Sequence, residues 1–201
     1  MSRLACLVLA AGAGSRFGGR KQLAPIAGKA MLVRTLERLV PLFRGDLYTV
    51  LGAYHDEVRP LIGELSQIIV HPAWRSGLGS SIARGVTEIG QRAAYDGIML
   101  ALADQVAVGR RDYARLIDRF DGTTLVAARY ADRTGVPALF PAPYFDRLRQ
   151  LTGDQGARSL LKAQAEQVIA VPMPTAKTDI DTQGELLHFS RILQGTDAYA
   201  L

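Results

Sequence analysis

Short apolar runs alternate with stretches of helical apolar spacing along the chain up to about residue 130. Residues 4–11 form a continuous apolar run, as expected of a strand that is covered on both faces. Between residues 29 and 42, apolar side chains recur at the spacing of one helix face. The same reasoning predicts further strands at 46–51, 67–70, 97–103 and 124–129, and further helices at 55–65, 80–92 and 110–120.

The alternation becomes less regular after residue 130. Residues 136–140 are strand-like but follow a turn at 132–135, which predicts a hairpin-like or antiparallel excursion. Beyond it we expect a strand at 168–171 and helices at 144–151, 157–163 and 183–193. No repeat, low-complexity tract or linker interrupts the sequence. We therefore expect one Rossmann-like three-layer α/β/α domain over residues 1–201, with a mostly parallel sheet and the antiparallel excursion in its C-terminal half.

The composition is that of a globular protein, with 48% hydrophobic and 21% charged residues in a chain of 201. The net charge of +5 mildly favours anionic ligands, but the basic residues are too few and too evenly spread to indicate nucleic-acid binding. Cys6 is the lone cysteine, which excludes a disulfide framework and suits a reducing cytoplasm. The apolar N-terminal run is too short to span a membrane, so we expect a cytoplasmic protein with no membrane partner.

A glycine-rich stretch, LACLVLAAGAGSRFGGRKQL at residues 4–23, lies between the first predicted strand and helix. That order is typical of phosphate binding, because glycine lets the backbone approach oxygen atoms and a helix N-terminus attracts anions. The Rossmann fingerprint G-x-G-x-x-G matches Gly12 and Gly14 but has Phe17 at its third position, and the acidic residue expected after the second strand is missing.

The Walker pattern G-x-x-x-x-G-K-[ST] also fails, because Arg20 follows Gly19 where lysine is required. One interpretation of the loop is a generic strand-to-helix turn. The other is a phosphate loop of a different kind, which Arg16 and Lys21 favour, since two fixed cations suit a ligand with several phosphates.

Small residues also precede the helix predicted at 80–92, in the stretch HPAWRSGLGSSIARGV at residues 71–86. Ser80 or Ser81 capping this helix is one interpretation. The other is a nucleobase loop, in which Gly77 and Gly79 let the ring lie against backbone while N–H and hydroxyl groups read its edge.

Three aspartates are candidate metal ligands. Asp104 follows the apolar strand at 97–103, and ligands of open α/β sheets bind at the carboxyl ends of strands. A carboxylate there suits Mg²⁺, which keeps phosphate and water as its other ligands; a turn or N-cap aspartate is the alternative. Asp179 and Asp181 share one side of an extended segment, so either is a candidate second carboxylate. Asp181 is equally a candidate N-cap of the final helix.

The motif LAAGAGSRFGGRKQL resembles the L-A-[AG]-G-x-x-x-R-[MF]-G-x-x-K-x-L signature of nucleotidyltransferases that activate a phosphate or sugar phosphate with an NTP. More narrowly, it is similar to the MobA/MocA-like family, which attaches a nucleotide to molybdopterin. Members that use GTP have Gly-Gly after L-A, and those that use CTP have Ala-Gly, as in Ala11-Gly12. The resemblance is therefore closest to the MocA-like molybdenum cofactor cytidylyltransferases and implies CTP, since a β-carbon at residue 11 leaves room better suited to a pyrimidine.

Four later motifs carry the same resemblance. Residues 71–86 are similar to N-P-x-W-x-x-G-[LM]-G-x-S-[LI], with His71 in place of Asn. Residues 102–106 are similar to L-x-D-x-P, with Val106 in place of Pro. GVP at 135–137 and GDQGAR at 153–158 resemble G-x-P-x-x-[FL] and G-D-x-G-A-R, and TDIDTQGEL at 178–186 resembles D-I-D-T-P-E-D-L.

The resemblance implies a nucleotide-diphospho-sugar-transferase-like fold in which residues up to about 130 bind the NTP and residues 131–201 bind the acceptor. The metal, Mg²⁺ or Mn²⁺, would be held by Asp104 with Asp179 or Asp181. Arg158 is either an acceptor ligand or a solvated helix residue. The implied nucleotide-binding residues are Leu9, Ala10, Ala11, Gly12, Gly14, Ser15, Arg16, Lys21, Gly77, Gly79, Ser80 and Ser81, and the acceptor-binding residues are Gly135, Pro137, Asp154 and Arg158.

The reaction so implied is attack by a terminal phosphate of the acceptor on the α-phosphorus of CTP, with release of pyrophosphate. A phosphate monoester is already a nucleophile, so the enzyme must chiefly bring two anions together and neutralise charge. Lys21 is expected on the α-phosphate, Arg16 on the β- and γ-phosphates, and Asp104 on the metal.

The product would be the cytosine dinucleotide cofactor of xanthine-dehydrogenase-type enzymes, which implies transient contact with such an apoenzyme or its maturation factors. Three alternatives remain: guanylyl transfer to the same acceptor, transfer to a sugar phosphate or other phosphate, and a non-catalytic carrier that hands the cofactor to an apoenzyme.

Overall fold

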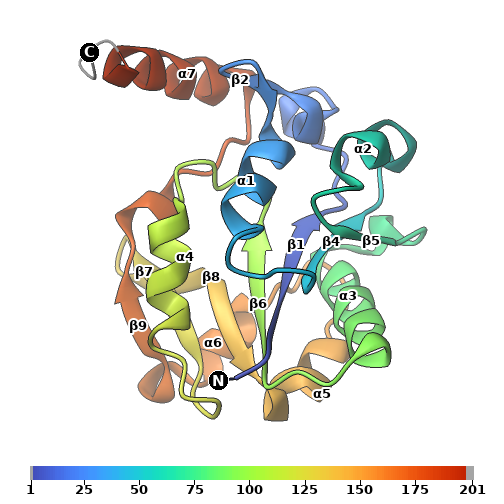
Figure 1. Cartoon of the computed structure of the whole chain (residues 1–201), viewed down its shortest axis with the longest axis vertical. Coiled ribbons are helices and arrows are strands. Elements are labelled where there is room, and N and C mark those ends of the chain that lie inside the picture. The colour runs from blue at the N-terminus through green and yellow to red at the C-terminus, as the bar shows by residue number, and fades with distance from the viewer. Residues whose placement is uncertain (1, 198–201) are drawn as a thin grey trace.

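The computed structural model describes residues 2–197, which fold around a seven-stranded sheet with helices on both faces (Figure 1). Residue 1 and residues 198–201, which the single-domain prediction also covers, lie outside the described residues. The strands lie in the order β5 (Gln67–Val70), β4 (Leu47–Leu51), β1 (Leu4–Ala10), β6 (Gly97–Leu102), β8 (Arg133–Pro141), β7 (Val126–Tyr130) and β9 (Ile169–Pro172). Every neighbouring pair is parallel except the two that contain β8. The predicted α/β class and antiparallel excursion are confirmed.

Alternating side chains along the strands divide the core into two layers. In β1, Cys6 and Val8 belong to the first layer, and Leu7 and Leu9 to the second. The first layer packs against α1 (Met31–Leu39), α2 (His55–Ile62) and α4 (Arg110–Ile117); the second packs against α3 (Leu78–Arg92), α5 (Phe145–Arg149) and α6 (Arg158–Ala163). Because both faces are buried, β1 is apolar at every position.

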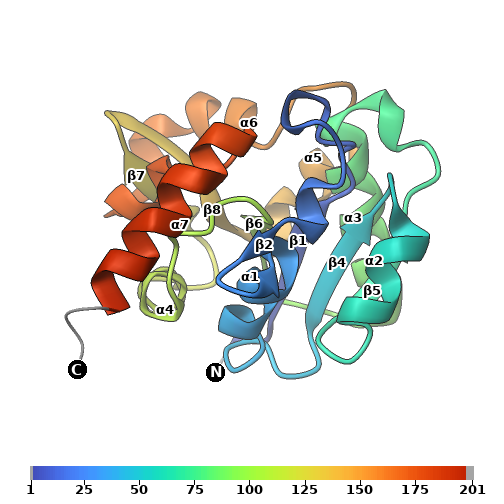
Figure 2. The same ribbon diagram turned by 90° about the horizontal axis from the view of Figure 1, so that it is seen from above.

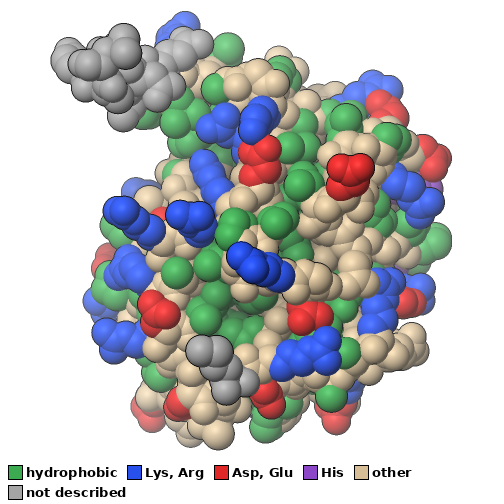
Figure 3. Space-filling model, viewed as in Figure 1, with side chains coloured by type: hydrophobic (Ala, Val, Ile, Leu, Met, Phe, Trp, Pro, Cys, Tyr) green, Lys and Arg blue, Asp and Glu red, His purple; other side chains and the backbone are tan. Residues whose placement is uncertain are grey.

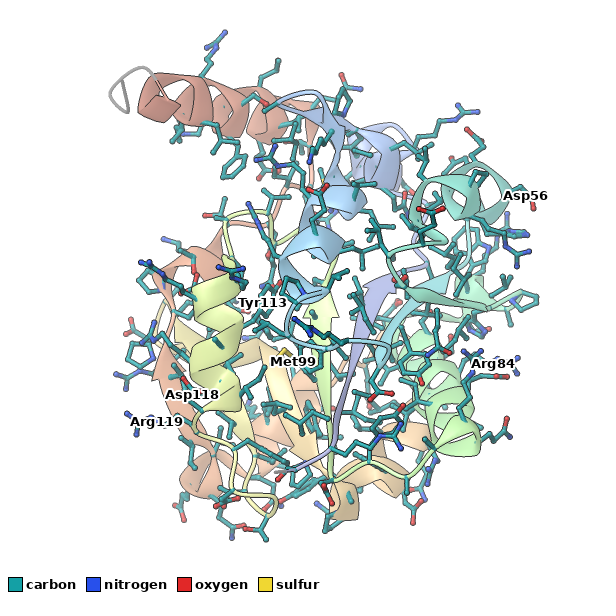
Figure 4. The ribbon with its side chains drawn as sticks, viewed as in Figure 1. Asp56, Arg84, Met99, Tyr113, Asp118 and Arg119 are labelled. Carbon is teal, nitrogen blue, oxygen red and sulfur yellow. The ribbon has the colours of Figure 1, made fainter. Side chains whose placement is uncertain are left out.

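The α4 helix shows how one element serves both core and surface. Tyr113 is fully buried and points from α4 into the first layer, whereas Asp118 and Arg119, at the end of the helix, point outward (Figure 4). Burial raises the pKa of the Tyr113 phenol well above its usual range.

Some predicted boundaries are wrong where a turn replaces a regular element. The helix predicted at 29–42 begins only at Met31, because β3 (Lys29–Ala30) pairs antiparallel with β2 (Pro25–Ile26). Ala27 and Gly28 between them have φ values of 46° and 78°, as a two-residue hairpin turn requires. The helix predicted at 144–151 is a 3-10 turn followed by the short α5.

A third apolar cluster lies beyond the carboxyl ends of β1 and β6. It joins Phe17 of the glycine loop and Val106 of the segment after β6 to Ile180 and Phe189 near the C-terminus. The helix that carries Phe189, α7 (Gln183–Asp197), crosses this end of the molecule when it is seen from above (Figure 2). The C-terminal segment is thus packed directly on the glycine loop.

The surface carries both signs of charge. On the face shown in Figure 3, Lys and Arg side chains are scattered, with Asp and Glu side chains among them. None of the helices within residues 2–197 has the length and apolar character that a membrane crossing requires.

Candidate nucleotide site

The glycine loop is built from two 3-10 turns, so the predicted order of strand, loop and helix is wrong at this point. The turns are Ser15–Phe17 and Lys21–Leu23, and α1 follows only after the β2–β3 hairpin. Gly14, with φ of 65°, lies so close to Lys21 that a β-carbon would stand 2.9 Å from the lysine Cβ. The loop offers turns and glycines, and the two segments that follow it directly are a 3-10 turn and a short strand rather than an α-helix.

Gln22 fixes the loop to the end of β1, a role that the sequence did not reveal. Its Nε2 donates to the carbonyls of Ala10 at 2.8 Å and Gly12 at 2.6 Å, and the side chain is buried. In the sequence, the only signal is a polar residue beside Lys21.

Lys21 holds the central position of the site. Its Nζ donates to Oδ2 of Asp104 at 2.6 Å and to Oδ1 of Asp181 at 2.7 Å, and its side chain is 13% exposed. Burial alone would lower the pKa of Lys21, but the two carboxylates outweigh burial and raise it. Arg16, with an 80% exposed side chain, pairs with Oδ2 of Asp181 at 3.1 Å. The two cations expected to hold phosphates therefore share one carboxylate.

Asp104 and Asp179 keep unused carboxylate oxygens. Oδ1 of each is buried and has no hydrogen-bond partner within the described part of the chain. Burial, followed by the charge of Asp104, raises the pKa of Asp179 to about 6. By contrast, the hydrogen bond from Lys21 lowers the pKa of Asp181. The three aspartates predicted from sequence lie together, and the pKa values of Asp179 and Asp181 are shifted in opposite directions.

The alternative role of Asp181 as N-cap of the final helix is wrong. Thr182 and Glu185 form a reciprocal cap: the Glu185 N–H donates to Thr182 Oγ1 at 3.2 Å, and the Thr182 N–H donates to Glu185 Oε2 at 2.8 Å. The side chain of Asp181 is therefore directed to Lys21 and Arg16 rather than to the helix.

These residues can hold a divalent metal only if the substrate supplies further ligands. Residues 2–197 contain no group of three or more His, Cys, Asp or Glu side chains placed to hold a metal ion. Mg²⁺, however, is commonly bound by one or two carboxylates, with substrate phosphates and water as further ligands. The unused oxygens of Asp104 and Asp179 are hard donors of that kind. The donor set thus fits Mg²⁺ or Mn²⁺ that arrives with a polyphosphate.

Two adjoining cavities open beside Lys21. The Lys21 cavity is lined by Leu9, Ala10, Gly12, Gly14, Lys21, Gln22, Met31, Ala103 and Asp104. The Asp154 cavity, of about 410 Å³, is lined by Leu9, Ala11, Gly12, Trp74, Arg75, Gly77, Leu78, Ser81, Leu102, Asp104 and Asp154. Leu9, Gly12 and Asp104 line both, so one elongated ligand can occupy the two cavities together.

The stretch predicted to read a base lies at the wall of the Asp154 cavity. Gly77 and Ser81 line it, whereas the Ser80 hydroxyl donates to the Gly77 carbonyl at 2.7 Å and lies 3.0 Å from His71 Nε2. Neither serine caps α3, which begins at Leu78, so the capping interpretation is wrong. Burial lowers the pKa of His71, which favours its neutral ring at pH 7.

The residues predicted to bind the acceptor do not all line a common cavity. Asp154 lines the Asp154 cavity, but Gly135, Pro137 and Arg158 line neither of the two cavities. Gly135 lies against the hydroxyl of Tyr130, where a β-carbon would come within 2.5 Å of the oxygen. Arg158 is the exposed first residue of α6.

Gln105 links the parts of the site, a role that its sequence motif did not predict. The side chain is fully buried, and its Nε2 donates to the carbonyls of Val136 at 3.0 Å and Ala176 at 2.9 Å. It thereby connects the residue after Asp104 to β8 and to the segment that leads to Asp179. The signal was present as a glutamine between Asp104 and the apolar Val106, just after a buried strand.

Arg38 braces the same loop from α1. Its Nη1 donates to the carbonyls of Val106 and Val108, and Val106 itself is fully buried. Packing and these hydrogen bonds fix the loop at Val106, the position at which the L-x-D-x-P motif has proline.

A family model described as the MobA-like NTP transferase domain matches residues 6–168. Among curated proteins, nicotine blue oxidoreductase of Paenarthrobacter nicotinovorans is 29% identical over 190 residues, covering 88% of this chain and 91% of its own. The bifunctional protein GlmU of Nitrosomonas europaea is 26% identical over 213 residues; the match covers 98% of this chain but only 46% of GlmU.

Solved structures show the same architecture. The crystal structure of Rv0371c from Mycobacterium tuberculosis H37Rv superimposes with a TM-score of 0.81 at 27% identity, covering 94% of this chain and 98% of that one. A second structure of Rv0371c, in complex with manganese, has a TM-score of 0.76 at 26% identity and covers 94% and 99%.

Proposed function

The chain belongs to the MobA-like NTP transferase family, and from that premise we propose that it transfers CMP from CTP to the terminal phosphate of molybdopterin or molybdenum cofactor, releasing pyrophosphate. In this proposal residues up to about 130 bind the nucleotide, and residues after about 130 supply much of the acceptor side. The reaction belongs in the cytoplasm, and the loaded cofactor passes to a xanthine-dehydrogenase-type apoenzyme.

The observation that carries the proposal is the position of Lys21 between Asp104 and Asp181, in the wall of the Lys21 cavity, which shares Asp104 with the Asp154 cavity. A nearly buried ammonium group there neutralises charge on the α-phosphate more strongly than an exposed one would. Arg16, exposed at the rim, exchanges its contact with Asp181 for the β- and γ-phosphates. Both cations are held in place by a carboxylate before the nucleotide arrives.

Mg²⁺ or Mn²⁺ would be held by Asp104 and Asp179, whose buried Oδ1 atoms lack partners among the described residues. When bound, the metal neutralises charge on the α-phosphate and on the pyrophosphate leaving group. The manganese complex of Rv0371c, which shares 26% identity with this chain, supports the choice of a divalent ion. Asp181 then acts on Lys21 and Arg16 rather than on the metal.

CTP is favoured over GTP by Ala11, which is buried and lines the Asp154 cavity. Its methyl group takes space that a purine would use. The acceptor is proposed from the family, with Gly135, Pro137 and Arg158 on its side of the molecule. Guanylyl transfer and transfer to a sugar phosphate or other phosphate remain the alternatives within the same reaction class.

A second candidate is a redox reaction, favoured by the 29% identity to nicotine blue oxidoreductase. Against it, the loop lacks the third glycine of a dinucleotide fingerprint. Phe17 stands there instead and is buried in the third apolar cluster.

The test is a pyrophosphate-release screen with CTP, GTP and UTP, Mg²⁺ or Mn²⁺, and either molybdenum cofactor or a sugar 1-phosphate as acceptor. We expect release with CTP and molybdenum cofactor, and none from Asp104→Ala. Preference for GTP overturns the base assignment, and turnover only with the sugar phosphate overturns the acceptor. Cofactor transfer to an apoenzyme that survives Asp104→Ala without pyrophosphate release indicates a carrier, and oxidation of NADH or NADPH without nucleotide turnover indicates the redox candidate.

A further inference from the structure

We infer that Asp154 is a base-reading residue of the nucleotide pocket, rather than an acceptor residue, and that it selects for a base with an amino group. The inference rests on the proposed function only in requiring that a nucleoside triphosphate fills the Asp154 cavity.

The loop that carries Asp154 contacts the start of α3 through backbone atoms. The Gly79 N–H donates to the Gly153 carbonyl at 2.8 Å. A β-carbon on Gly77 would lie 2.3 Å from the carbonyl of Gly153, and one on Gly79 would lie 2.6 Å from the carbonyl of Gln155. The backbones of the two segments therefore touch at two glycines, and residues 152–156 form one wall with the start of α3.

This wall faces the nucleotide side of the site. Asp154 lines the same cavity as Ala11 of the glycine loop and as Gly77 and Ser81 at the start of α3. Arg158, four residues further along the GDQGAR motif, does not line it. The motif is thus divided: its aspartate lines the pocket that contains Ala11, and its arginine does not.

The chemistry of a carboxylate decides what it reads. An ionised carboxylate only accepts hydrogen bonds, and it repels the phosphates of an NTP. No hydrogen bond or ion pair within residues 2–197 engages the Asp154 side chain, so its oxygens are available to a ligand. Cytosine presents an amino donor at the position where uracil presents a carbonyl acceptor. Asp154 therefore favours CTP over UTP. The limited space beside Ala11 favours a pyrimidine over a purine.

The test measures dissociation constants of the whole chain for CTP and UTP by calorimetry, with Mg²⁺ and without acceptor. We expect the wild type to bind CTP about tenfold or more tightly than UTP, and Asp154→Asn to reduce that ratio about tenfold, because an amide can donate to the uracil carbonyl. The matched control is Asp118→Asn, at an exposed aspartate that points outward at the end of α4 (Figure 4) and lines neither cavity, and it should leave the ratio unchanged.

An equal loss of CTP and UTP affinity in Asp154→Asn overturns the inference, since it indicates contact with the ribose or a structural role. Unchanged nucleotide affinities with a raised KM for the acceptor also overturn it and restore Asp154 to the acceptor side. If CTP binds with the expected ratio but no molybdopterin turnover occurs, the proposed function fails and the inference stands. If neither nucleotide binds, both fail.

Discussion

Lys21 and Asp104 meet at 2.6 Å although they lie 83 positions apart in the sequence. The contact arises because β1 and β6 are neighbours in the sheet, so that the segments after their carboxyl ends adjoin. A loop cation and a strand-end carboxylate therefore form one charged unit beside the two cavities.

Replacing Lys21 with Ala should lower the rate of pyrophosphate release about 10²- to 10³-fold, the usual cost of removing one donor from a transition-state charge site. Asp104 and Asp181 would also lose their shared partner. Single-turnover kinetics at saturating CTP measure the effect. The matched control is Lys29→Ala, since that lysine is exposed and Glu37 is its one ion-pair partner in the described part of the chain. Full activity in Lys21→Ala would refute the assigned role.

Asp179 gives the protein a specific pH dependence. Its folded-state pKa of about 6 lies above the value of about 3.9 for an exposed aspartate. The folded protein therefore binds the proton more tightly than the unfolded chain, and this group makes stability fall as pH rises from about 4 to 6.

Asp179→Asn should accordingly match the wild-type Tm near pH 4 and exceed it at pH 7, as thermal denaturation across that range can show. Adding Mg²⁺ at pH 7 should raise the wild-type Tm more than that of the variant. Identical pH profiles for the two proteins would contradict a raised pKa of Asp179 in the folded protein.

Removing the Gln105 side chain should destabilise the protein by about 2–4 kcal/mol, because the buried carbonyls of Val136 and Ala176 would lose a donor. The KM for CTP and kcat should both worsen, since Asp104 is adjacent. Urea denaturation and steady-state kinetics of Gln105→Ala measure these effects. Gln150→Ala, at an exposed position, serves as the control. A change below 0.5 kcal/mol, which is typical of surface substitutions, would show that the bridge is dispensable.

Two glycines of α3 should respond oppositely to alanine. Gly79→Ala should be destabilising and should weaken CTP binding, because the new methyl group meets the backbone of Thr152 and Gln155. Gly90→Ala should be neutral or stabilising by up to about 1 kcal/mol, because only the mobile end of Arg149 stands in its way and alanine favours a helix. Calorimetric Tm values compare the two. Equal effects would show that the contact between the start of α3 and residues 152–156 does not stabilise the protein.

The sequence predicted most of the fold because burial on both sheet faces leaves a readable apolar pattern. For that reason residues 4–11 and 97–103 were correctly predicted as strands. The turn before β8 indicated that this strand is antiparallel to its neighbours. The β2–β3 hairpin was missed because its turn is Ala27–Gly28, which lacks the Asn-Gly or Asp-Gly signature.

The charged residues of the site were named from motifs, but their pairing was not. A motif cannot show that Lys21 lies between Asp104 and Asp181, because that contact depends on the packing of the C-terminal segment. Nor could it show Gln105, which acts through backbone carbonyls of segments far away in sequence. The contact of the Asp154 loop with Gly79, from which the base-reading role is inferred, is likewise visible only in three dimensions.

The bond between Lys21 and Asp181 also has a consequence for the order of events during synthesis. Its two ends are 160 residues apart, so a ribosome that has translated Lys21 must add 160 more residues before the second carboxylate exists. Until then the glycine loop can meet Asp104 but lacks both Asp181 and the apolar cover of Phe189. A nascent chain stalled before residue 181 should therefore have its core strands paired and yet an unfinished loop, which makes nucleotide binding a late event in the maturation of the protein.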